Sequence, residues 1–263
     1  MRLHAECKMT LTASEDCPVV ARMRPRSGQA QWMVSEVYQV RPWVPTTEYV
    51  DSYGNLCQRL MIPKGEMRIE VSTIMETEEV IAVAPDAGIT PIPELPSDVL
   101  VYLLQSRYCP SDKMAYRARE ITRDVAPGYP QVEAIRAWIR DNVEYRYGVS
   151  DGSTDALDTL AVGSGVCRDF AHIGAALCRA LHIPARMVVG YLYELDPMDM
   201  HAWFEAWLGG RWYTFDATQM KRRGGRLVVA YGRDAADVAF LSNYGPLEVR
   251  DIKVTVDCLA RET

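Results

Sequence analysis

The sequence predicts an α+β protein, with a β-rich, sandwich-like N-terminal domain and a second domain of mixed helices and strands. Three observations support this fold class. Residues 1–84 consist of short β-branched or aromatic segments separated by turn residues. Residues 85–97 carry four prolines and a glycine, a composition typical of an extended linker. Helical periodicity begins directly afterwards, so we expect the second domain at residues 98–263.

The composition is that of an ordinary globular protein. Of the 263 residues, 48% are hydrophobic, which is enough for a sizeable core. The formal net charge of −6 argues against a dedicated nucleic-acid binder, because such proteins carry a basic surplus that neutralises phosphates. It also argues against a polybasic membrane patch, and no segment approaches the ~20 apolar residues of a membrane-spanning helix.

The seven cysteines are widely and irregularly spaced, and the sequence contains no Cys-x-x-Cys pair. We therefore expect neither a zinc knuckle nor a thioredoxin-type motif, and no metal or cofactor site is predicted. Arg2, Glu6 and Lys8 interrupt the start of the chain, which does not resemble a signal peptide. Thiols without a secretion signal favour the reducing cytoplasm as the location.

The N-terminal part contains several strand-like segments bounded by turn signals. They lie at residues 8–12, 32–40, 56–62 and 67–73. Apolar and polar residues alternate in the last of these segments, which is typical of a strand with one buried face. An antiparallel sandwich is the simplest arrangement of such strands.

Three helices are expected after the linker. Ser97 is suited to cap a helix that runs through residue 104, and Pro110 precedes a second helix that ends near residue 124. Tyr129-Pro130 opens the third, because a proline in the first turn loses no hydrogen bond. The apolar stripe of this third helix consists of Val132, Ile135, Trp138, Ile139 and Val143.

The next part of the chain places a cysteine before an amphipathic helix and a histidine before a strand. A glycine-bearing loop ending at Cys167 leads into a helix that Ile183-Pro184 stops. Gly209-Gly210 is a two-residue hairpin signal between two of the strands that follow. The expected strands lie at residues 185–193, 201–208, 212–216, 226–231 and 252–259.

Cys167 is the candidate nucleophile. The positive end of the helix dipole and the unpaired N–H groups of the first turn favour a thiolate over a thiol. The same N–H groups can stabilise an oxyanion. The alternative is that Cys167 is simply a small buried apolar residue. Its place at a Gly-x-Gly-x-Cys helix start, with histidines downstream, favours the nucleophile.

Of the four histidines, His201 is the candidate base. His4 lies in the N-terminal domain. His172 lies roughly 140° around the helix from Cys167, and His182 lies ~22 Å along its axis, so both should be structural. His201 begins a strand, and its alternation with Ala202 predicts that it points away from the core.

Asp216 is the candidate acid that orients the base. In a hairpin centred on Gly209-Gly210, Leu208 pairs with Arg211. Position 201 is then opposite 218, so Asp216 lies within diagonal reach of His201. A carboxylate there would accept the imidazole N–H and select its tautomer. The alternative for Asp216 is a turn or capping aspartate.

Several blocks together resemble the transglutaminase-like superfamily and occur in its order. They are Gly165-Val166-Cys167-Arg168-Asp169-Phe170-Ala171-His172, Ile183-Pro184-Ala185-Arg186, Gly190-Tyr191, His201-Ala202-Trp203-Phe204-Glu205, Trp212-x-x-x-Asp216-Ala217-Thr218 and Gly232-Arg233-Asp234-Ala235-Ala236-Asp237-Val238. Asp51-x-x-Gly54-Asn55 resembles the N-terminal region of bacterial members. Ala217 departs from the pattern, because many members have proline there.

The resemblance implies a papain-like core in which a helix bearing Cys167 packs on an antiparallel sheet bearing His201 and Asp216. It implies cysteine-dependent acyl transfer at an amide or peptide bond through a thioester. Hydrolysis, as in a protease or amidase of a protein or peptide substrate, is favoured over transfer to an amine. The Cys167 N–H is one expected oxyanion donor, and the segment 145–150 is a candidate source of the other.

Two alternatives stay open from the sequence. Arylamine N-acetyltransferases share the order Cys, His, Asp, although no signature for acetyl-coenzyme A is visible. A catalytically silent protein-binding module is the other, although an intact triad argues against it. The sequence does not indicate an oligomeric state.

Overall fold

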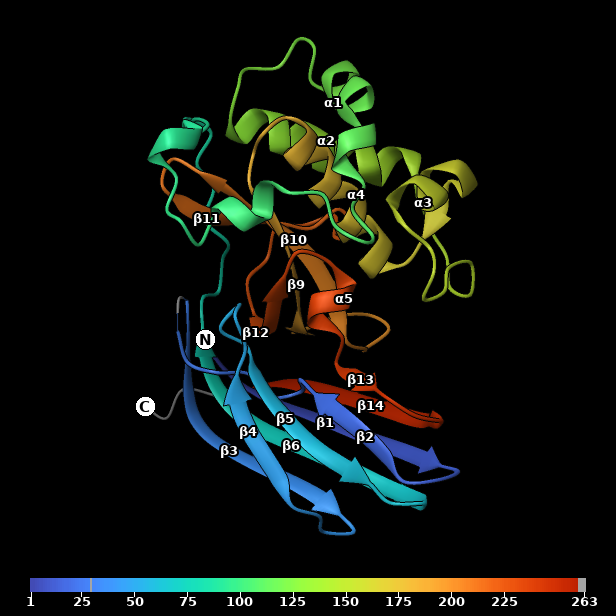
Figure 1. Cartoon of the computed structure of the whole chain (residues 1–263). Coiled ribbons are helices and arrows are strands. Elements are labelled where there is room, and N and C mark those ends of the chain that lie inside the picture. The colour runs from blue at the N-terminus through green and yellow to red at the C-terminus, as the bar shows by residue number, and fades with distance from the viewer. Residues whose placement is uncertain (29, 260–263) are drawn as a thin grey trace.

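The computed structural model describes residues 1–28 and 30–259. Mixed helices and antiparallel sheets confirm the predicted α+β class, with a β-sandwich on one side and a helix-covered sheet on the other (Figure 1). Buried apolar side chains of both parts belong to one continuous hydrophobic core. None of the described helices is long and apolar enough to span a bilayer.

Two four-stranded antiparallel sheets form the sandwich. One has the order β14-β1-β6-β3 and the other β13-β2-β5-β4. Burial alternates along β1 and β6, so each presents one apolar face to the space between the sheets. The bounds are β1 Arg2–Ala13, β2 Cys17–Ala21, β3 Gln31–Arg41, β4 Thr46–Val50, β5 Leu56–Ile62, β6 Gly65–Thr77, β13 Leu241–Asn243 and β14 Leu247–Leu259.

The end of the chain returns to the sandwich. We expected residues 98–263 to form one domain, but β14 pairs with β1 along its whole length and β13 pairs with β2. These late strands occupy edges that β1 and β2 would otherwise leave with unpaired N–H and C=O groups. The last strands therefore complete the N-terminal sheets instead of the second domain.

The segment 85–97 contacts the second domain through its backbone. Ala87 C=O accepts a hydrogen bond from Tyr129 N–H at 2.8 Å, and Gly88 C=O accepts one from Gly209 N–H at 2.9 Å. Gly128 is required at this contact, because its φ is +99° and a Cβ there would lie 2.3 Å from the Ala87 oxygen. A hydrogen-bonded turn at Pro85–Asp86 and one 3₁₀ turn, η1 (Ile92–Glu94), interrupt this segment.

Two of the three expected helices are shorter than predicted. The segment 97–104 forms only a 3₁₀ turn, η2 (Leu100–Leu103), in which Tyr102 alone is buried. A single buried side chain does not provide the apolar stripe that stabilises a longer helix. The second expected helix is divided into η3 (Ser111–Lys113) and α1 (Ala115–Ile121). The third is confirmed as α2 (Tyr129–Asn142).

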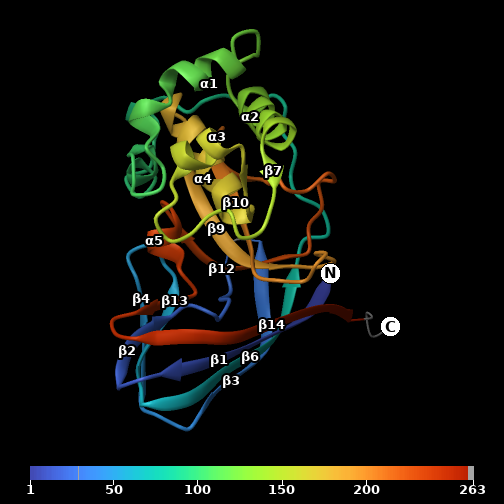
Figure 2. The same cartoon turned by 90° about the vertical axis from the view of Figure 1, so that its right-hand side faces the viewer.

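The second domain contains a third four-stranded sheet, with the antiparallel order β11-β10-β9-β12. Helix α4 (Cys167–Ala180) packs on its strands β10 and β9 (Figures 1 and 2). Helices α2 and α3 pack in turn against α4. This is the expected arrangement of a central helix on an antiparallel sheet. The remaining bounds are β7 Glu144–Tyr145, α3 Ala156–Val162, β8 Ser164–Gly165, β9 Ala185–Leu192, β10 His201–Leu208, β11 Arg211–Phe215, β12 Arg226–Gly232 and α5 Ala235–Val238.

Candidate active site

Cys167 is the first residue of α4, and a buried aspartate organises the turn before it. The Asp169 carboxylate accepts the Val166 N–H at 2.9 Å and the Ser150 hydroxyl at 2.5 Å. A Cβ on Gly165 would lie 2.8 Å from the Asp169 Cβ, so only glycine fits there. The Gly-Val-Cys-x-Asp pattern therefore specifies an N-terminal helix cap. This cap places the partly exposed thiol of Cys167 at the positive end of the helix dipole.

His201 and Asp216 meet across the β10–β11 hairpin. The predicted pairing of Leu208 with Arg211 is confirmed. His201 Nε2 lies 2.8 Å from Asp216 Oδ2. The other carboxylate oxygen accepts two hydrogen bonds from Thr218, one from its N–H at 3.0 Å and one from its hydroxyl at 2.7 Å. Asp216 is thus held from both sides.

The environment of His201 differs from the prediction that it points away from the core. Its side chain is 2% exposed, and that of Asp216 is 4% exposed. Both faces of β10 are buried, since α4 covers the face of Phe204 and the Arg226 guanidinium lies 4.8 Å from the centre of the Trp203 ring on the other face. The imidazole–carboxylate contact is therefore shielded from water, which strengthens it.

Opposing effects set the charges of this pair. Burial alone lowers the pKa of His201, but the charge and hydrogen bond of Asp216, together with a hydrogen bond to the Cys167 thiol, raise that pKa to about 9. Burial alone raises the pKa of Asp216, but His201 and Arg226 outweigh it and hold that pKa well below its usual range. Because Nε2 contacts Asp216, Nδ1 is the ring nitrogen that remains for the thiol.

The other histidines lie elsewhere, as expected. His172 is fully buried, stacks on Tyr108 with ring centres 5.1 Å apart, and accepts the Ala235 N–H at 3.1 Å. Burial lowers its pKa to about 3. His182 is exposed at the end of the same helix, with a φ of +59°. His4 contacts Ser72 in the sandwich.

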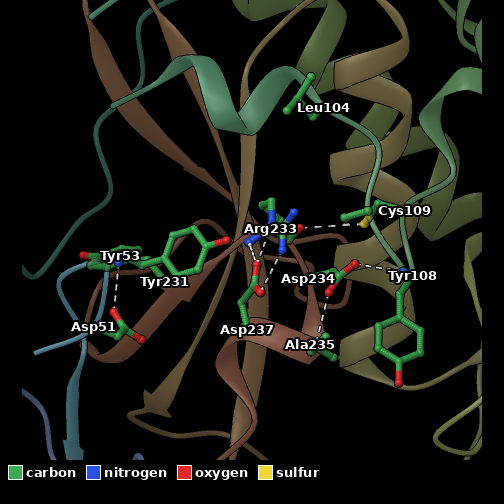
Figure 3. A network of polar contacts seen from close by, with 12 residues as sticks. Asp51, Tyr53, Leu104, Tyr108, Cys109, Tyr231, Arg233, Asp234, Ala235 and Asp237 are labelled. Atoms are coloured by element: carbon green, nitrogen blue, oxygen red, sulfur yellow. Dashed lines mark hydrogen bonds and ion pairs between the residues drawn. The ribbon is translucent and has the colours of Figure 1, made fainter. Parts of the chain in front are cut away.

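The Gly232–Val238 block, which resembles the family, forms a polar network with neighbouring segments (Figure 3). The Arg233 guanidinium pairs with Asp237 at 2.9 Å, and the Asp234 carboxylate accepts the Tyr108 N–H at 2.8 Å. The Cys109 thiol and the Arg179 guanidinium both donate to the Arg233 carbonyl oxygen. These contacts tie β12 to the helix that carries Cys167, so the block has a structural role.

Two further residues contact Asp216 at the site. Arg226 Nη2 lies 2.9 Å from Asp216 Oδ2, and Thr218 caps the same carboxylate. Nothing in the spacing links Arg226 to the triad, because the contact exists only in the folded sheet. Thr218 belongs to the Trp212–Thr218 block, but nothing in its position shows that its side chain faces back to Asp216.

Tyr145 lies within the segment expected to provide an oxyanion donor. Its hydroxyl accepts a hydrogen bond from the Cys167 N–H, and its ring centre is 5.8 Å from that of Phe170 in the first turn of α4. Burial and the nearby Cys167 and Tyr147 raise its pKa, so the hydroxyl keeps its proton. Among residues 1–28 and 30–259, no cluster of histidine, cysteine, aspartate or glutamate could hold a metal ion.

Residues 115–217 match the model of the Transglutaminase-like superfamily. A crystal structure of a protein from Cytophaga hutchinsonii, provisionally named a cysteine protease, is 33% identical, with a TM-score of 0.93 over 100% of this chain and 92% of that one. An uncharacterized protein of Mycobacterium leprae is 29% identical over 255 residues, or 90% of each chain. One of Mycobacterium tuberculosis is 34% identical over 156 residues, covering 52% of this chain and 50% of its own. The matches and the shared fold show that this chain belongs to the transglutaminase-like superfamily.

Proposed function

We propose that the protein is a cysteine enzyme that cleaves an amide or peptide bond through a thioester, with Cys167 as nucleophile, His201 as general acid and base, and Asp216 as orienting acid. One observation carries the proposal. A buried imidazole contacts a carboxylate through Nε2 at 2.8 Å and faces, through its other nitrogen, a thiol at a helix N-terminus. This arrangement has the three parts of a nucleophilic triad.

Acylation follows from this geometry. The Cys167 thiolate attacks the carbonyl carbon and forms a C–S bond, while the carbonyl oxygen becomes an oxyanion at the Cys167 N–H. We assign the Tyr145 hydroxyl as the second donor. It accepts the Cys167 N–H in the structure, and the oxyanion would take the place of this contact and accept from both groups. When the C–N bond breaks, the proton on His201 passes to the leaving amine. A thioester and a neutral imidazole remain.

Deacylation completes the cycle. Neutral His201 accepts a proton from a water molecule as its oxygen attacks the thioester carbon. The C–S bond breaks, a carboxylic acid leaves, and the thiolate–imidazolium pair is restored. An amine in place of water would give a transglutaminase-type product instead, and an acetyl donor would give N-acetyltransferase chemistry.

Substrate and location are further parts of the proposal. We favour hydrolysis of a protein or peptide, supported by the provisional name of the Cytophaga hutchinsonii relative. We place the enzyme in the cytoplasm, supported by seven cysteines that are all free thiols within the described residues.

The first test is the pH dependence of iodoacetamide alkylation, mapped to each cysteine by mass spectrometry. Cys258 is the internal comparison, because it is an exposed free thiol. Burial raises the pKa of Cys7 and of Cys109 to about 12, so these two should stay unreactive. Below about pH 7 we expect Cys167 to react at least about tenfold faster than Cys258, since a paired thiolate persists where a free thiol is protonated.

The matched variants are His201→Ala and His182→Ala. The first should remove the excess reactivity of Cys167, while the second changes an exposed histidine of the same region and should leave it intact. A Cys167 that reacts no faster than Cys258 at acidic pH would overturn the proposal and favour a binding module. Carboxamide and peptide libraries, assayed with and without added amines, then separate hydrolysis from amine transfer.

A further inference from the structure

Arg226 shares one carboxylate oxygen with His201. Its Nη2 lies 2.9 Å from Asp216 Oδ2, and His201 Nε2 lies 2.8 Å from the same atom. The side chains of Arg226 and Asp216 are 6% and 4% exposed, so the ion pair is shielded from water. Arg226 is outside the part of the chain that matches the family model, which ends at residue 217.

Asp216 is the carboxylate that pairs with the Arg226 guanidinium. Within the described part of the chain, its Nε and Nη1 are buried and have no hydrogen-bond partner. The guanidinium lies over the Trp203 ring, 4.8 Å from the ring centre, a contact that holds its plane. A cation with a single carboxylate partner keeps that carboxylate ionised and fixed.

The β-sandwich holds the strand that carries Arg226. Strand β12 is the edge of its sheet, and side chains from the sandwich cover the free edge. The Thr77 hydroxyl donates to the Arg226 carbonyl oxygen at 3.0 Å. The Gln31 amide accepts the Val228 N–H at 2.7 Å and donates to the Val228 C=O at 2.9 Å. The N-terminal half of the chain thus fixes a residue of the site in the second half.

We propose that Arg226 is a positioning residue of the triad, which holds Asp216 against His201 and balances the charge of the buried site. This inference rests on the proposed function. With the thiolate–imidazolium pair formed, Cys167, His201, Asp216 and Arg226 carry charges that sum to zero. Without Arg226 the same group carries a net negative charge in a nearly dry site, which is unfavourable.

Other charged and titratable groups surround this cluster and are already engaged or lie at its edge. Glu205 of β10 is paired with Arg186, and Asp169 of α4 is paired with Arg168. The remaining ones are Tyr145 beside Cys167, Tyr231 of β12 and Glu78 after β6. None of the paired groups offers a second cation for Asp216, so Arg226 is the group to remove.

The decisive variants are Arg226→Gln, which removes the charge, and Arg226→Lys, which keeps it. If the triad is formed, alkylation of Cys167 across the pH range should show two transitions, the formation of the thiolate and the loss of the His201 proton. In Arg226→Gln both should move upward by about one pH unit, because a lost cation several ångström away favours protonation of both groups. In Arg226→Lys both should stay, while the maximal rate constant falls severalfold because a lysine lacks the planar fork.

The control is Arg186→Lys. Arg186 is equally buried in the same sheet, pairs with Glu205 at 2.6 Å and also lies over aromatic rings, but Glu205 is not part of the triad. It should leave both the transitions and the rate constant at wild-type values. If Arg226→Gln does not fold, Arg226→Lys decides the matter, since wild-type kinetics in that variant would overturn the inference.

The two proposals fail in different ways. A reactive wild-type Cys167 with unchanged transitions in Arg226→Gln overturns only the role of Arg226. A wild-type Cys167 without acid-range reactivity overturns the triad and this inference together.

Discussion

Because the pKa of His201 is raised, we expect the protein to lose stability as the pH becomes alkaline. The folded protein holds the His201 proton up to about pH 9, whereas an unfolded histidine releases it near 6.5. The folded state therefore binds the extra proton in the interval between these values. By linkage, this contribution to stability is fully present below 6.5 and is lost as the pH rises through 9.

The size of the effect follows from the same interval. One unit of pKa difference corresponds to ~1.36 kcal/mol, so the interval from 6.5 to about 9 corresponds to about 3 kcal/mol. The cause is the contact of Nε2 with the Asp216 carboxylate at 2.8 Å, in a site where both side chains are almost fully buried. Water screens such a pair weakly, so the contribution needs no large discount for exposure.

The assay is urea unfolding, followed by tryptophan fluorescence from about pH 6 to about pH 10 under reducing conditions. His201→Gln is the matched variant, because glutamine keeps a hydrogen-bonding side chain but does not titrate. Both proteins compared also carry Cys167→Ala, because the thiol ionises together with His201 and would offset its proton. The difference in free energy of unfolding between Cys167→Ala and Cys167→Ala/His201→Gln should shrink by up to about 3 kcal/mol across this range, since the remaining titrating groups are common to both proteins.

His172 provides an internal contrast of opposite sign. Burial lowers its pKa to about 3, so the folded state keeps it neutral while an unfolded histidine takes up a proton below 6.5. Its contribution is lost as the pH falls below 6.5, and His201 accounts only for the alkaline side. A difference between Cys167→Ala and Cys167→Ala/His201→Gln that stays flat from about pH 6 to about pH 10 would refute the assignment of a protonated His201.

Two further predictions concern packing and the contact between the two halves. In Gly174→Ala the new Cβ would lie 2.4 Å from the Phe204 ring, so we expect a loss of about 1–3 kcal/mol in chemical denaturation, and Phe204→Leu in the same chain should restore part of it. An unchanged unfolding midpoint would show that α4 can shift away from the sheet. Asn55→Ala removes two hydrogen bonds of 2.7 Å to the Tyr231 backbone and should cost about 2–4 kcal/mol. Deuterium exchange should rise in β12, and exchange that rises equally everywhere would contradict this local role.

The sequence by itself determined the features that depend on neighbouring residues. The helix start at Cys167 is encoded locally, because Gly165 and Asp169 build its cap within five residues. The hairpin register is local as well, since Gly209-Gly210 places Leu208 opposite Arg211 and so brings Asp216 toward His201. The α+β class could be predicted for the same reason, because strand-like and helical segments are recognised from neighbouring residues. The order Cys, His, Asp is read directly from the sequence.

Features that depend on long-range contacts could not be predicted. The return of β13 and β14 to the sandwich depends on free strand edges that exist only after the first strands have folded. The burial of His201 also escaped prediction, because alternation along β10 does not show that a second layer covers its other face.

Tertiary structure alone placed Arg226 beside Asp216. The two residues are ten positions apart, on a strand and a loop that meet only because β12 pairs with β9. An arginine in a strand is usually a surface residue, so its type gave no signal. Folding turned it into a buried counter-ion by removing water from both charges at once, and such a change in environment has no signature in the order of the residues.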